Sequence, residues 1–129
     1  MATVFFIGRI IFGLYWLKMA YNHFKKVDAM TGYATFKGVP YPRLAVLGGG
    51  VLLLLGGLSV LLGLMPHIGL TLLLVFLIPV TFKMHAFWKE TDLTARSGDE
   101  VQFYKNLGLI GALLMLYMIA TPWHYSIGW

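Results

Sequence analysis

The chain carries no charged side chain between Arg43 and His67, a stretch dominated by leucine and glycine. A helix needs about 20 apolar residues to cross the hydrocarbon core of a bilayer, and this stretch is long enough. Charged residues make up only 12% of the chain, whereas a soluble globular domain is usually about one quarter charged. So few charges could not coat a soluble protein of this size, so the sequence predicts a helical protein embedded in a membrane.

The rest of the chain predicts three more membrane-spanning helices. The segment between the first two, about 25–43, is basic and rich in aromatic residues, so we expect it to lie in the membrane interface or to re-enter the membrane. Ser97 and Glu100 have the spacing of a capping box, which predicts that the last helix begins there. The expected fold is all-α: one domain, residues 1–129, forming an antiparallel bundle of four transmembrane helices. The predicted spans are about 3–24, 44–64, 66–87 and 100–121.

The basic side chains lie mainly in two of the three predicted loops. These two loops share one side of a four-span protein, and the positive-inside rule places them in the cytoplasm and both termini outside. Membrane orientation explains the basic composition, so we expect no nucleic-acid partner. Eight of the ten Lys and Arg residues belong to these loops and their flanks: Lys25, Lys26, Lys37, Arg43, Lys83, Lys89, Arg96 and Lys105.

Glycines recur at helical spacing in two of the predicted spans. Gly49, Gly56 and Gly63 are seven residues apart, and Gly108 and Gly111 lie in the last span. Small residues on one face allow a neighbouring helix to approach closely. We therefore predict that these glycines are helix-packing positions.

Polar and aromatic residues gather where the third span ends and the fourth begins. A helical hairpin would bring them to one membrane face, and the end of the first span and the first loop would add to them. A quinone head group needs donors for two carbonyls and an aromatic wall, which such a set provides. A lipid phosphate would suit it as well, and Lys, Trp and Tyr at an interface also serve as ordinary anchors. The candidate pocket comprises His23, Lys37, His85, Trp88, Tyr104, Lys105 and Asn106.

Arg9 is a charge inside the first predicted span, near its outer end. Its side chain is suited to donate hydrogen bonds to helix carbonyls and hold them together. It is equally suited to contact an anion, a head group or a partner on the outer face. His23 and His85 are expected on one face, with His67 and His124 on the other. These pairs lie at helix ends without a spacing motif, which argues against haem and against a metal site.

Catalytic motifs are not evident in the sequence. The chain has no cysteine, which excludes a disulfide relay and any iron–sulfur or thiolate metal site within it. We find no catalytic triad, glycine-rich phosphate loop or paired-carboxylate site. We therefore assign no catalytic residue, and at most we expect a subunit of a quinone-linked oxidoreductase.

Five short motifs are spread along the chain: Arg9 with Gly13, Lys37-Gly38-Val39-Pro40, Gly56-Gly57 with Gly63, His85-Ala86-Phe87-Trp88 and Phe103-Tyr104-Lys105-Asn106-Leu107. With these motifs the chain resembles the DoxX family, small four-span membrane proteins of the bacterial and archaeal cytoplasmic membrane. The resemblance covers nearly the whole chain, although the acidic residue that many members carry in the second span is absent. It implies a redox-linked membrane role, because the family name comes from a thiosulfate:quinone oxidoreductase and quinol-oxidase context.

Three functional hypotheses remain open from the sequence. The first is a redox-linked subunit that binds a quinone or docks redox partners in the bilayer. The second is an assembly or scaffold subunit that uses its glycines and the aromatic tail, residues 122–129, to contact other membrane proteins or a second copy of itself. The third is a small-molecule carrier, although the chain is short and shows no inverted repeat.

Overall fold

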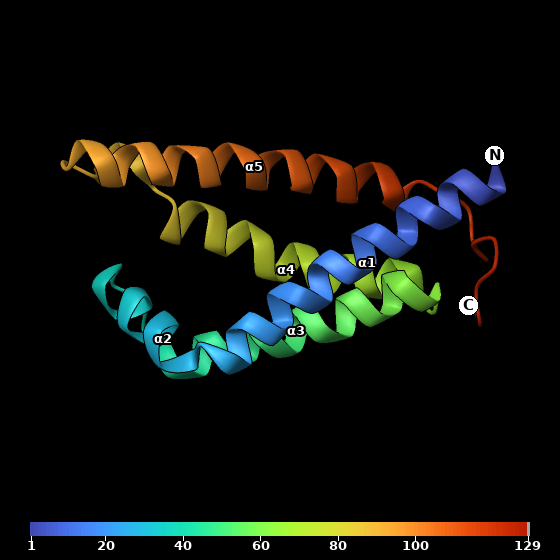
Figure 1. The fold of residues 1–129 in the computed structure, drawn as a ribbon, viewed down its shortest axis with the longest axis horizontal. Coiled ribbons are helices and arrows are strands. Elements are labelled where there is room, and N and C mark those ends of the chain that lie inside the picture. Colours follow the sequence, from blue (N-terminus) through green and yellow to red (C-terminus); the bar gives the residue numbers. More distant parts are fainter. Residues whose placement is uncertain (129) are drawn as a thin grey trace.

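The computed structural model describes residues 1–128, which form five α-helices and one short 3-10 helix and no strand. Trp129, the last aromatic residue of the expected tail, lies outside the described residues. The two termini lie at the same end of the molecule, and α2 lies at the opposite end (Figure 1). The elements are α1 (Ala2–Lys25), α2 (Val27–Phe36), α3 (Pro42–Leu62), α4 (Pro66–Met84), η1 (Phe87–Lys89) and α5 (Leu93–Tyr117).

The contact between α1 and α3 depends on glycine. A Cβ atom built on Gly13 would lie 2.8 Å from the Cβ of Leu61, and one built on Gly57 would lie 3.0 Å from the Cβ of Trp16. The two backbones therefore approach more closely than side chains would allow. Trp16 is fully buried at this contact.

The glycines predicted to pack fall into two groups. A Cβ on Gly49 or Gly56 would meet side chains of α4, and Gly63 is the left-handed C-cap of α3. By contrast, nothing lies within 4 Å of a Cβ on Gly108 or Gly111. Among residues 1–128, these last two glycines therefore do not form a packing face, because α5 turns another side toward α4.

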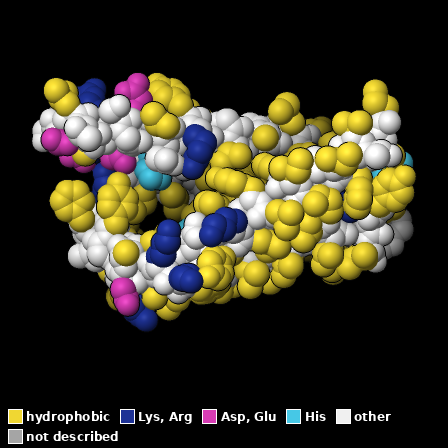
Figure 2. Space-filling view, viewed as in Figure 1, with side chains coloured by type: hydrophobic (Ala, Val, Ile, Leu, Met, Phe, Trp, Pro, Cys, Tyr) yellow, Lys and Arg dark blue, Asp and Glu magenta, His cyan; other side chains and the backbone are white. Residues whose placement is uncertain are grey.

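Three helical segments are long and apolar enough to cross a membrane: Ala2–Lys25, Pro42–Leu62 and Pro66–Lys89. The helix α5 is of similar length, but its first half contains charged residues. The structure thus supports an all-helical, multi-pass membrane protein with three candidate spans among residues 1–128, and the expected four-span bundle is not confirmed. Figure 2 shows hydrophobic side chains over most of the surface and acidic side chains only at the end that holds α2.

The start of α5 differs from the sequence prediction. The helix begins at Leu93, and the side chain of Asp92 caps it by accepting a hydrogen bond from the Ala95 backbone N–H at 2.9 Å. The capping box expected at Ser97 and Glu100 is therefore wrong, because both residues lie inside the helix. The additional turns place Asp99 on the helix instead of in a loop.

Candidate functional site

A cavity of about 670 Å³ lies where α5 diverges from α1 and α2. The helix α5 packs on α4 and η1, whereas α1 packs on α3, so the two halves of the molecule separate toward the end that holds α2 (Figure 1). The space-filling view is hollowed between these halves (Figure 2). Most of the lining is apolar and includes Trp16, Leu53 and Phe76.

Polar side chains from α5 line one wall of this cavity. Asn106 is 4% exposed, and no hydrogen bond joins its carboxamide to another side chain or backbone group among residues 1–128. One residue before it, the ammonium of Lys105 donates to Gln102 Oε1 at 2.7 Å. Buried carboxamides normally have partners, so the free donors and acceptor of Asn106 are available to a bound molecule.

Two histidines contribute to the same lining from α1 and from the end of α4. His23 Nδ1 donates to the Met19 carbonyl at 2.9 Å, which leaves Nε2 as an acceptor in the neutral ring. His85 Nδ1 lies 3.4 Å from Asp99 Oδ1, so its Nε2 is also left for a second partner. The cavity therefore offers both donors and acceptors at its polar end.

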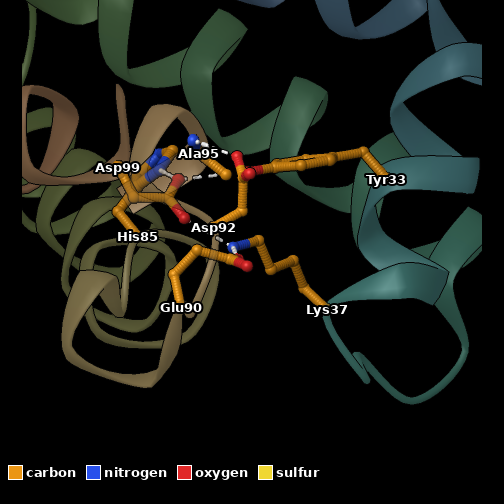
Figure 3. Close-up of polar contacts among 7 residues, drawn as sticks. All are labelled: Tyr33, Lys37, His85, Glu90, Asp92, Ala95 and Asp99. Carbon is orange, nitrogen blue, oxygen red and sulfur yellow. Dashed lines mark hydrogen bonds and ion pairs between the residues drawn. The ribbon is translucent and has the colours of Figure 1, made fainter. Parts of the chain in front are cut away.

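A buried ionic cluster joins α2 to α5 beside the cavity (Figure 3). Its centre is Asp99, whose carboxylate accepts hydrogen bonds from Lys37 Nζ at 2.6 Å and from the Tyr33 hydroxyl at 3.1 Å. His85 contacts the same carboxylate, and Glu90 lies 3.4 Å from Lys37 Nζ. These contacts connect segments that are far apart in the sequence and close one end of the hollow.

The environment of the cluster favours the charged forms of its two principal members. Burial disfavours the ionised Asp99, but hydrogen bonds from Lys37, His85 and Tyr33 outweigh it and hold the pKa of Asp99 below its ordinary value of 3.8. Burial likewise opposes the ammonium of Lys37, yet the bond to Asp99 and its neighbours raises the pKa of Lys37 above 10.5. The pair is therefore ionised throughout the neutral range.

The structure divides the candidate pocket residues into three groups. His23, His85, Lys105 and Asn106 line the cavity. Lys37 belongs to the ionic cluster beside it. Trp88 and Tyr104 lie in an aromatic cluster with Phe87 and Phe103, are 46% and 58% exposed, and are not among the cavity-lining residues.

Sequence reasoning missed the acidic half of this site. Asp99, Tyr33 and Glu90 are not among the residues that the sequence predicts for the pocket. A helix that begins at Leu93 places Asp99, Phe103 and Asn106 at the i, i+4 and i+7 positions of one buried face. The sequence contains this spacing. Because the last helix was expected to begin at Ser97 and Glu100, Asp99 was not expected to lie on its buried face.

At the opposite end of the molecule, Arg9 contacts the C-terminal tail. Its two terminal nitrogens donate to the carbonyls of His124 at 2.7 Å and Tyr125 at 2.9 Å. His67 lies at this end too, where its Nε2 is 3.0 Å from the Tyr117 carbonyl. Among residues 1–128 no three His, Asp or Glu side chains are grouped to hold a metal ion.

A comparison with protein families matches residues 4–86 to the model described as DoxX, which is more than half of the chain. The chain belongs to the DoxX family. The match includes α1 to α4 and three of the candidate residues, His23, Lys37 and His85, but it ends before α5. No curated protein and no solved structure matched the chain.

Proposed function

We propose that this DoxX-family protein is a redox-linked membrane subunit that binds a lipid-soluble quinone in the 670 Å³ cavity. The observation that carries the proposal is a largely apolar cavity with a few polar groups in its wall, namely Asn106, which is 4% exposed, and the histidines His23 and His85. Ligand sites typically measure about 300–1,000 Å³ and combine an apolar lining with a few placed polar groups. A quinone ring matches this chemistry, because it is apolar apart from two carbonyl oxygens.

The polar residues suit both redox states of such a ring. The amide of Asn106 and the ammonium of Lys105 can each donate to a quinone carbonyl. Nε2 of His23 can accept from a quinol hydroxyl. Reduction of a quinone takes up two electrons and two protons, and the chain has no cysteine to hold an iron–sulfur cluster. In this proposal a partner redox protein supplies the electrons, and His85, which contacts Asp99, relays protons to the cavity.

The proposal predicts that two substitutions remove quinone binding without unfolding the protein. The probe is decylubiquinone, titrated into detergent-purified protein and followed by tryptophan quenching, with mass spectrometry of extracted native ligand. We expect Asn106→Leu and His85→Gln each to weaken binding by about tenfold or more, the effect of losing one good hydrogen bond to a buried group. Asn22→Leu and His67→Gln change the same residue types away from the cavity and should bind as the wild type does.

The thermal unfolding midpoint of each variant separates lost binding from lost folding. If Asn106→Leu and His85→Gln retain wild-type affinity, the cavity is not the quinone site. If no quinone binds even to the wild-type protein, the redox proposal fails as a whole.

One observation favours a non-enzymatic assembly subunit as the second candidate. Gly108 and Gly111 leave open space on the surface of α5, four and seven residues after the exposed Tyr104 and therefore on the same side of the helix. Such a face would accept a helix of another membrane protein or of a second copy. Gly111→Leu would then release a copurifying partner or dissociate a dimer in detergent, whereas a purely quinone-binding monomer would be unaffected.

A further inference from the structure

A second cavity, of about 350 Å³, lies at the end of the molecule that holds both termini. It lies between the N-terminal half of α1, the C-terminal half of α5 and the tail that follows α5. Its lining is almost entirely apolar and includes Phe5, Phe12 and Leu116. Gly8 lies at its edge, where a Cβ would meet no atom within 4 Å.

Arg9 contributes a buried positive charge to this cavity. The residue is 4% exposed, and its Nε–H has no hydrogen-bond partner. Its terminal nitrogens donate to neutral carbonyls, its guanidinium lies 5.1 Å from the centroid of the Phe6 ring, and no carboxylate among residues 1–128 pairs with it. A charge in such surroundings is costly unless an anion accompanies it.

Among residues 1–128, no acidic side chain lies at this end to accompany Arg9. The acidic side chains gather at the end of the molecule that holds α2 and the start of α5 (Figure 2). A counter-ion for Arg9 therefore has to come from outside the described chain. The five acids are Asp28, Glu90, Asp92, Asp99 and Glu100.

A second unpartnered donor lines the same cavity. Trp123 is 3% exposed, its indole Nε1–H has no partner, and its ring makes an edge contact with Phe5 at 5.4 Å between centroids. Both free N–H groups are shielded from water, so a ligand oxygen would bond to them only if the tail moved. Two independent observations thus point to one ligand: an uncompensated cation and an orphaned donor beside an apolar space.

We propose that this cavity binds one anionic lipid, with its head-group oxygens at Arg9 and Trp123 and an acyl chain along Phe5, Phe12 and Leu116. The shared chemistry is an anionic oxygen head group on a long apolar chain. A fatty acid carboxylate and an anionic phospholipid phosphate both provide it. The site does not depend on what occupies the cavity at the opposite end.

The test is native mass spectrometry of full-length, delipidated protein in detergent. The protein carries a C-terminal affinity tag for purification. The probes are palmitate, phosphatidylglycerol and the zwitterionic phosphatidylcholine. We expect one molecule of palmitate or phosphatidylglycerol to bind, and phosphatidylcholine to bind at least about tenfold more weakly, because it carries no net charge.

Three variants assign the binding to this cavity. Gly8→Leu fills the cavity without touching the hydrogen bonds of Arg9, so it should reduce binding about tenfold or more while folding normally. Its matched control is Gly48→Leu, which adds the same side chain to open space on α3 outside both cavities. Arg9→Gln should also lose binding, and Arg9→Lys should retain most of it because the charge remains.

The relative affinities of palmitate and phosphatidylglycerol show whether the site prefers a fatty acid or an anionic phospholipid. Binding of either probe supports the site. The proposal is overturned if Gly8→Leu binds the anionic probes as the wild type does. It is also overturned if phosphatidylcholine binds as tightly as phosphatidylglycerol, because the charge of Arg9 would then not discriminate between a zwitterionic and an anionic lipid. Arg9→Gln could unfold the tail, but the Gly8→Leu result stands without it.

Discussion

At the scale of single residues, Asp99 is the most constrained position of the candidate site. Its side chain is 6% exposed and pairs with Lys37, which is 11% exposed. Removing one partner of a buried ion pair leaves the other charge uncompensated and typically costs about 3 kcal/mol or more. We therefore expect Asp99→Asn to lower the free energy of unfolding by roughly 3 kcal/mol, measured by chemical denaturation in detergent. Asp28→Asn is the control, because its pair with Arg43 is exposed and such pairs contribute less than about 1 kcal/mol.

The same pair gives the stabilisation a defined pH window. The pKa of Asp99 is lowered on folding, so its contribution is present above 3.8 and is lost as the pH falls through the folded value. The pKa of Lys37 is raised, so its contribution is present below 10.5 and is lost as the pH rises through the folded value. The difference in melting temperature between wild type and Asp99→Asn should be constant across neutral pH and shrink in acid below 3.8. A difference that disappeared already near neutral pH would contradict this assignment.

At the scale of elements, the contact between α1 and α3 fixes one half of the bundle. A Cβ on Gly13 would lie 2.8 Å from the Cβ and 2.9 Å from the Cα of Leu61, so the backbone of α3 would have to move. Overpacking of this kind typically costs about 1–3 kcal/mol. We expect Gly13→Ala to destabilise the protein by that amount in thermal unfolding. Gly48→Ala, in open space on α3, should be neutral or slightly stabilising, because alanine is the better helix former. Equal behaviour of the two variants would show that the helices are not this close.

Some features of the helices could be predicted from the sequence, and the start of α5 could not. Three of the predicted spans follow from hydropathy, and the four cavity residues His23, His85, Lys105 and Asn106 follow from their expected places at span ends. The beginning of α5 did not follow from the sequence. Asp92, Ser97 and Glu100 are all residue types that occur at the start of helices, and only the structure shows that Asp92 caps this one. With the start misplaced, the buried position of Asp99 could not be recognised.

At the scale of the whole molecule, the site depends on contacts that no local pattern encodes. Lys37 and Asp99 are 62 residues apart, and their pairing holds α2 against α5 across the cavity. Hydropathy predicts which segments enter the membrane, but it does not predict which charged side chains at the helix ends pair with one another. The divergence of α5 from α1 toward α2, and with it the larger cavity, goes together with this long-range arrangement.

The number and direction of the membrane crossings give the last prediction. Three crossings would put the two termini on opposite sides, yet both lie at one end, and α5 runs back along α4 (Figure 1). Pairing of Asp99 with Lys37 neutralises part of the charge at the start of α5, so its apolar remainder can serve as a fourth crossing. The chain has no cysteine, so single substitutions can be labelled with a membrane-impermeant maleimide.

We expect Thr3→Cys and Ile127→Cys to react in intact cells, and Thr91→Cys to react only after permeabilisation, because the basic loops favour the cytoplasm. Permeabilised cells, in which all three should label, provide the control for reactivity. Labelling of positions 3 and 127 from opposite sides would show an odd number of crossings and would remove α5 from the membrane. Labelling of position 91 alone in intact cells would keep four crossings but reverse their direction, which would place the proposed quinone cavity at the outer face and the lipid site at the inner one.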